Sequence, residues 1–103
     1  MGAYFKWKVF IKEQDINIKN ILYDLMKLRL TLDIKYKEHI KGFFENIQNA
    51  SDELNNNKLS DIGKHYKDYI RAIDSIEECS DSFFSNILKG ISEIKNEIDI
   101  LKE

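Results

Sequence analysis

Residues 18–40 read IKNILYDLMKLRLTLDIKYKEHI, and the spacing of the apolar residues in this stretch decides the expected fold class. Ile18, Ile21 and Leu25 follow one another at gaps of three or four, which places them on one face of an α-helix. The spacing continues toward both ends of the chain and predicts one helix over residues 12–54, roughly 65 Å long at about 1.5 Å per residue. The other members of this first apolar row are Ile11, Leu28, Leu32, Tyr36, Ile40, Phe43, Ile47, Ala50 and Leu54.

A second apolar row follows and predicts a second helix over residues 59–102. The sequence Asn-Asn-Asn-Lys at residues 55–58 tolerates the left-handed conformation that ends a helix, so we expect a turn there. Ser60 is a suitable cap for the second helix. Two helices of similar length with a short connection form an antiparallel hairpin, and the expected class is all-α. The second row consists of Leu59, Ile62, Tyr66, Tyr69, Ile73, Ile76, Cys79, Phe83, Ile87, Ile91, Ile94, Ile98 and Leu101.

The composition agrees with one helical domain. The chain has 103 residues, of which 33% are charged, with four glycines and no proline, whereas β-sandwiches recruit glycine and proline for their many turns. The formal net charge is −2, so no overall positive field attracts nucleic acid, and no nucleic-acid partner is expected. Cys79 is the one cysteine, which excludes an intramolecular disulfide, and its position on the second row indicates a small core residue.

Two alternative folds stay open at this point. Gly42 and Gly90 lie inside the predicted helices, and either glycine could mark a kink or a break, for example in a three-helix fold that breaks near Gly42. Residues 28–37 alternate strictly between apolar and polar, as do residues 5–9, which is also the pattern of a half-buried strand. Two such strands would give an α+β fold.

The predicted first helix is apolar on a second side. Tyr23, Met26, Leu30 and Ile34 lie roughly opposite the first row, and the other arm of a hairpin covers only that row. We expect a second chain to bury this side, so that two hairpins complete a four-helix bundle. The partner is then a second copy or another helical protein. The alternative is that the N-terminal dozen residues or a bent second arm cover it.

Residues 1–11 form a segment of mixed aromatic and basic character, with Trp7 and Phe10 as its largest candidates for partner anchors. Residues 4–12 also suit weak contact with a membrane surface, where tryptophan lies at headgroup level and lysine meets anionic phosphate. Lys6 and Lys8 interrupt the apolar start of the chain, so no cleavable signal peptide is expected. The expected location is cytoplasmic, with secretion without a signal peptide left open.

The sequence offers few groups for chemistry. His39 and His65 are the candidate bases, and the predicted hairpin places them on different arms at different heights. Asp61, His65 and Asp68 share a helical face, yet such a trio on an exposed helix is typical of surface ion pairs. We therefore expect no catalytic residue, no cofactor and no metal, and a non-enzymatic protein–protein interaction module as the function.

A helical hairpin of about this length resembles, in architecture, the small substrates and targeting partners of Gram-positive type VII secretion, and more distantly a BAR-type membrane-shaping arm. The Trp-x-Gly turn of the first family is missing, because residues 55–63 read NNNKLSDIG. No tyrosine lies in the C-terminal segment to begin a Tyr-x-x-x-Asp/Glu export signal. No functional residue is therefore transferred. The richness in Ile, Lys and Asn suggests an AT-rich genome, as in many bacteria.

Overall fold

The computed structural model describes the backbone of residues 2–54, 57–78 and 80–101, and the side chains of residues 8–50, 66–78 and 80–100. Within these backbone ranges the chain forms four helices and no strand. The all-α expectation is confirmed, and the strand interpretation of residues 28–37 is wrong. The helices are α1 (Gly2–Thr31), α2 (Ile34–Leu54), α3 (Asn57–Asp74) and α4 (Asp81–Leu101).

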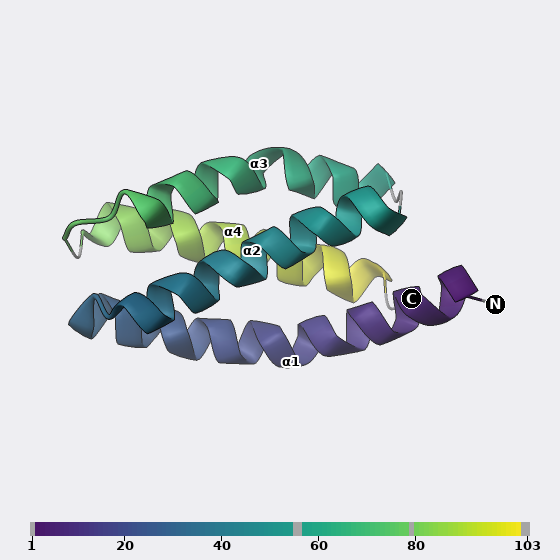
Figure 1. Ribbon diagram of the computed structural model, residues 1–103, viewed down its shortest axis with the longest axis horizontal. Helices are drawn as coiled ribbons and strands as arrows, with labels where there is room; N and C mark the ends of the chain where they lie inside the picture. Colours follow the sequence, from purple (N-terminus) through teal and green to yellow (C-terminus); the bar gives the residue numbers. More distant parts are fainter. Residues whose placement is uncertain (1, 55–56, 79, 102–103) are drawn as a thin grey trace.

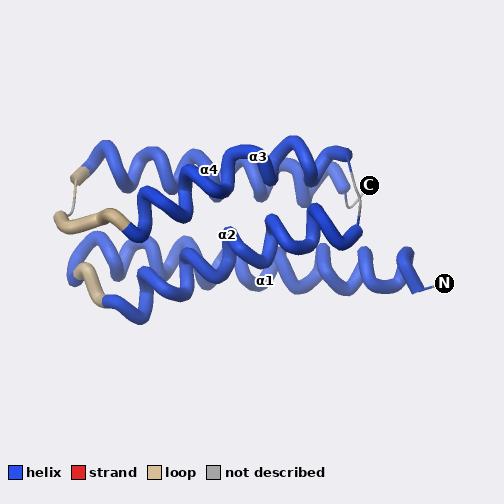
Figure 2. Tube along the Cα trace, turned by 45° about the horizontal axis from the view of Figure 1, so that its top comes forward, coloured by secondary structure: helices blue, strands red, loops and turns tan. Residues whose placement is uncertain are grey.

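Successive helices run in opposite directions, so each lies antiparallel to the next one in the chain (Figure 1). α1 contacts α2 and α4, and α3 contacts the same two helices, which gives a bundle with extents of 46 × 23 × 20 Å. The turn after α1 and the connection before α4 lie at one end of the bundle (Figure 2). The first turn of α1 and the last turn of α4 lie at the other end.

The bundle is equivalent to the expected hairpin folded in half. Each predicted arm breaks near its middle, at residues 32–33 and at residues 75–78 and 80. The pairs α1 with α4 and α2 with α3, which a continuous hairpin would hold together, are retained. Folding adds the pairs α1 with α2 and α3 with α4. The two continuous arms over residues 12–54 and 59–102 are therefore wrong, and one chain builds the four-helix arrangement that we expected from two.

The first break is stabilised by local hydrogen bonds. Leu32 adopts a φ of 50°, and its N–H donates to the carbonyl of Leu28 at 2.9 Å, which ends α1. Asp33 then caps α2, because its Oδ1 accepts the N–H of Lys35 at 3.0 Å. The left-handed conformation strains a non-glycine residue by about 1–2 kcal/mol. Packing of the Leu32 side chain against the core offsets this strain.

The second break has its own cap. Ser80 Oγ accepts the N–H of Phe83 at 3.2 Å, and its carbonyl accepts the N–H of Phe84 at 3.2 Å, so Ser80 is the N-cap of α4. Asp81 lies in the first turn, where its negative charge is favoured by the helix dipole. At the same end of the bundle, Lys37 Nζ donates to the carbonyl of Asp74 at 3.1 Å and covers the C-terminus of α3.

Several helix boundaries differ from those predicted from the sequence. α1 already begins at Gly2, so the backbone of residues 2–11 is the start of a helix and not a separate segment. Residues 55–56 of the expected turn lie outside the described residues, and α3 begins at Asn57. Ser60 consequently lies inside α3 and does not cap it. Cys79 also lies outside the described residues.

The predicted rows supply most of the core, together with two phenylalanines that the rows did not include. Phe44 and Phe84 are buried beside Phe43 and Phe83. Each Phe-Phe pair gives its helix a second buried direction, which a helix needs when two neighbours pack against it. The other buried apolar side chains are Ile11, Ile18, Ile21, Leu25, Leu28, Ile40, Ile47, Ala50, Tyr66, Ile73, Ile87, Ile91, Ile94 and Ile98.

Gly42 and Gly90 break no helix, and only one of them is needed for packing. A Cβ atom built on Gly90 would lie 2.7–3.0 Å from the ring carbons of Tyr69, whereas one on Gly42 would meet nothing within 4 Å. The Tyr69 ring in turn stacks on Phe44, with centroids 5.2 Å apart. The missing side chain at Gly90 therefore lets α3 and α4 approach.

Candidate functional site

The second apolar side of α1 stays exposed although the chain folds back on itself. Relative exposures are 53% for Tyr23, 56% for Met26 and 74% for Leu30, and Ile34 at the start of α2 is 72% exposed. The bend therefore does not cover this side, contrary to the alternative raised from the sequence. We name these four residues the exposed patch. Exposed apolar side chains that gather on one side of a small domain are a common feature of interaction sites.

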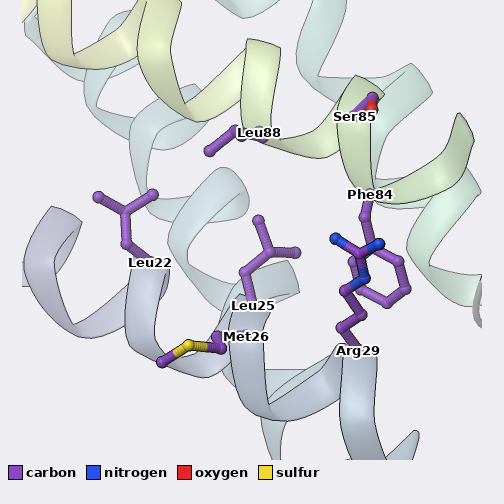
Figure 3. Close-up of a pocket in the computed structure, with 7 residues that line it drawn as sticks. All are labelled: Leu22, Leu25, Met26, Arg29, Phe84, Ser85 and Leu88. Atoms are coloured by element: carbon purple, nitrogen blue, oxygen red, sulfur yellow. The ribbon is translucent and has the colours of Figure 1, made fainter. Parts of the chain in front are cut away.

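A groove between α1 and α4 borders the exposed patch and has a volume of about 250 Å³ (Figure 3). Leu22 and Leu25 point toward Leu88 across it, and Met26 belongs both to the groove and to the patch. Its lining is mostly aliphatic and aromatic carbon, which suits an inserted apolar side chain. The lining residues are Leu22, Leu25, Met26, Arg29, Phe84, Ser85 and Leu88.

Arg29 closes one end of the groove. Its guanidinium carbon lies 5.9 Å from the centroid of the Phe84 ring, a cation–π distance, and Figure 3 shows the two side chains overlapping. The guanidinium also pairs with the carboxylate of Asp81 at the start of α4. Arg29 thus links the end of α1 to the start of α4, and it places a positive charge beside an apolar groove.

Asp24, which the sequence places next to the exposed patch, is turned away from it. Asp24 is 7% exposed, and its Oδ2 contacts Nδ1 of His39 on α2. The pair connects α1 to α2 and removes one carboxylate from the outside of α1. On that outside, Lys27 Nζ lies 5.3 Å from the centroid of the Tyr23 ring. The charge beside the patch on α1 is therefore mainly positive.

The residues predicted for the partner interface differ in their position and burial. It brings Tyr23, Met26 and Leu30 together on the outside of α1, with Ile34 following directly after the turn. Phe10 is partly buried and packs against the core, so it is not a free anchor. The side chain of Trp7 lies outside the described residues.

Sequence reasoning missed the α4 side of the site. Leu88 is 46% exposed and lies on none of the predicted rows, so it was an outward apolar residue that the sequence alone could have flagged. Arg29 and Phe84 gave no comparable signal, because their roles depend on α1 and α4 lying side by side at this height.

The histidines and carboxylates considered for catalysis or metal binding are not brought together among the described side chains. His39 is half-exposed, and its Nδ1 contacts the carboxylate of Asp24. The side chains of Asp61 and His65 lie outside the described residues, so the predicted trio with Asp68 is not assembled from what the structure describes.

Comparison of the chain with protein-family models, with curated proteins and with solved structures gives no match. Over the residues that the structure describes, none of the helices is both long and apolar enough to cross a membrane.

Proposed function

We propose that the protein is a non-enzymatic helical interaction module that docks a helical partner, either a second copy or another chain, on the exposed patch. The observation that carries this proposal is that Leu30 and Ile34 remain more than 70% exposed in a chain that builds its own four-helix core. Burial of four such side chains is worth at most about 6–12 kcal/mol, a substantial driving force for association.

The groove beside the patch supports the same function. Interface energy is concentrated where an apolar anchor enters a pocket, and the groove offers such a pocket directly beside Met26. Methionine also adapts its shape to a non-identical surface. Arg29 at the end of the groove already pairs with Asp81, and its guanidinium has further N–H donors that suit a partner carboxylate.

Site-specific photo-cross-linking tests the proposal. We would replace Leu30 with a benzophenone amino acid in cells that naturally contain the protein, and compare it with the same replacement at Ile100. Ile100 is the matched control, because it is also an exposed apolar residue but belongs to the last turn of α4, at the opposite end of the bundle from the end of α1. We expect one discrete adduct from position 30 that Met26→Asp abolishes, and none from position 100.

Light scattering of the purified protein completes the test and separates a second copy from another chain. A dimer at tens of micromolar that Leu30→Asp dissociates indicates self-pairing. A monomer together with a position-30 adduct indicates a different chain. A monomer that forms no adduct at position 30 contradicts the proposal.

Contact with a membrane surface is the second candidate function. The observation that favours it is the combination of aromatic and lysine residues in residues 4–12 with lysines along the outside of α1. Flotation with anionic vesicles tests it. Flotation lost in Trp7→Ala, together with assembly that Leu30→Asp leaves intact, would favour the membrane over the protein partner.

A further inference from the structure

The exposed patch is one end of a longer row on α1. Val9, Ile16, Tyr23 and Leu30 recur at intervals of seven residues, and all four are exposed. We name these four residues the outer row. It extends roughly 32 Å along α1 at about 1.5 Å per residue. A helix that packs lengthwise against another has apolar residues at two positions of every seven, three or four residues apart. The outer row fills one of these positions, and the other holds Lys12, Lys19 and Met26.

Lysines accompany the outer row. Lys12 and Lys19 follow Val9 and Ile16 at a gap of three, which places them on the same side of α1, and both are exposed. Lys27 lies over the ring of Tyr23.

Acidic side chains offset this charge only in part. Asp24 is buried against His39, so its carboxylate does not face outward. Glu13 is exposed at the edge of the outer row, and the partly buried Asp15 lies three residues after Lys12 and four before Lys19. Three lysines against these two carboxylates still leave the row with a net positive charge.

Building on the proposed function, we propose that the partner is an amphipathic helix of a different chain, with apolar residues at heptad spacing and carboxylates that face Lys12, Lys19 and Lys27. The apolar side chains of this acidic helix pack along the outer row. Its carboxylates pair with the three lysines, and electrostatic complementarity of this kind selects the partner more than it adds affinity.

A second copy of the chain fits the outer row less well. In a parallel pairing, Lys12 and Lys19 meet the same lysines of the other copy. In an antiparallel pairing centred on the outer row, Lys19 lies near the midpoint and again meets itself. Like charges that face each other across an interface are unfavourable, so the row selects against its own copy.

A lipid surface also fits less well than a helix. A helix that lies on a membrane presents a broad apolar face and keeps its lysines at the margins. On the first half of α1 the exposed apolar residues, Val9 and Ile16, form a single file with Lys12 and Lys19 beside it, and the apolar surface widens only from Leu22 and Met26 onward. A single file matches the width of one packed helix.

Two synthetic peptides of about 28 residues, or four heptads, test the proposal on the full-length protein. Both carry leucine and isoleucine at the core positions. One has glutamate at the flanking positions and the other has lysine. We expect fluorescence anisotropy to show that the acidic peptide binds at least about tenfold more tightly, with a preference that shrinks in about 0.5 M salt.

Charge-reversal variants make the test specific. The double variant Lys12→Glu/Lys19→Glu should reverse the preference between the two peptides. Lys89→Glu is the matched control, because Lys89 is an exposed lysine on α4, away from the outer row, and its replacement should leave the preference unchanged. Circular dichroism of each variant checks that the fold is retained.

Three outcomes overturn the proposal. Equal affinity for the two peptides, or no binding of either, means that the outer row does not select an acidic helix. Binding to vesicles of phosphatidylcholine and phosphatidylglycerol without a peptide preference assigns the row to a lipid surface. If position 30 still yields its adduct in these cases, only the acidic partner is rejected. If that adduct is also absent, the proposed function fails as well.

Discussion

The two sides of α1 have nearly the same pattern and opposite surroundings. The inner side carries Ile11, Ile18 and Leu25 at intervals of seven, all buried against the rest of the bundle. The outer side carries the outer row at the same interval, with every member exposed. Periodicity therefore identifies a helix face that is suited to packing, but it does not reveal whether the chain itself or another molecule covers that face.

The largest expected effect is the difference in unfolding free energy between alanine substitutions at two leucines that are two residues apart. Leu28 is fully buried and Leu30 is 74% exposed. Leu28→Ala should lower the free energy of unfolding by about 2–5 kcal/mol, because it leaves a cavity in the core. Leu30→Ala should change it by less than about 0.5 kcal/mol. Urea denaturation measures both, and equal losses would mean that the outer side is covered in the free protein.

The two glycines within the helices provide the next test. Gly90→Ala forces a Cβ against the Tyr69 ring, which Phe44 holds by stacking, so we expect a net loss of about 1–2 kcal/mol. Gly42→Ala meets open space and should stabilise the protein by up to about 1 kcal/mol, since alanine favours a helix. Thermal denaturation compares them. Stabilisation by both substitutions would show that α3 and α4 do not approach closely at Gly90.

The helical class and most of the core could be predicted because apolar spacing records burial directly. The breaks could not. Neither uses glycine or proline, and Leu32 is an unusual residue for a left-handed conformation. Ser60-Asp61 and Ser80-Asp81 are identical as local cap signals, yet only Ser80 caps a helix. The choice between them depends on where the folded arms pack, which no local pattern contains.

The candidate site was predictable to the same extent. Tyr23, Met26 and Leu30 were found because they form a second apolar side on one helix. The groove was missed, because it requires Leu88 of α4 beside Leu22 and Leu25 of α1. A site between two helices depends on their contact at a given height, whereas a site on one helix depends on the sequence of that helix alone.

Substitution of the cap residue Asp33 tests whether the break between α1 and α2 depends on local hydrogen bonds. Asp33→Ala removes the acceptor for the N–H of Lys35 and should cost about 1 kcal/mol. Asp33→Asn, which keeps an oxygen acceptor, should retain most of the stability. Urea denaturation of both variants is the measurement. An unchanged midpoint for Asp33→Ala would show that packing alone sets the break.

The smallest expected effect concerns a polar group on the inner side of the bundle. The Tyr66 ring is fully buried, and its hydroxyl has no hydrogen-bond partner among the side chains that the structure describes. Burial raises the pKa of Tyr66 above its ordinary value, and the neighbouring Tyr69, Glu93 and Glu97 act in the same direction. The folded protein therefore keeps this hydroxyl neutral when an unfolded chain would release the proton.

The pH dependence follows from this difference in pKa. Below about pH 10 the hydroxyl is neutral in both states, so titration of Tyr66 leaves the stability constant there. As the pH rises above that value, the hydroxyl ionises in the unfolded chain before it does in the folded protein, and the free energy of unfolding falls. Tyr66→Phe should raise the unfolding free energy at neutral pH by up to about 1 kcal/mol, because it removes a buried polar group without a partner. It should also reduce the loss of stability above about pH 10, with a remainder from Tyr69, whose pKa burial also raises.

Tyr23→Phe, at an exposed tyrosine of the outer row, is the control and should change neither quantity. Urea denaturation of the three proteins at neutral pH and above about pH 10 measures the effect. A lower stability for Tyr66→Phe at neutral pH would mean that the hydroxyl has a hydrogen-bond partner in the folded protein.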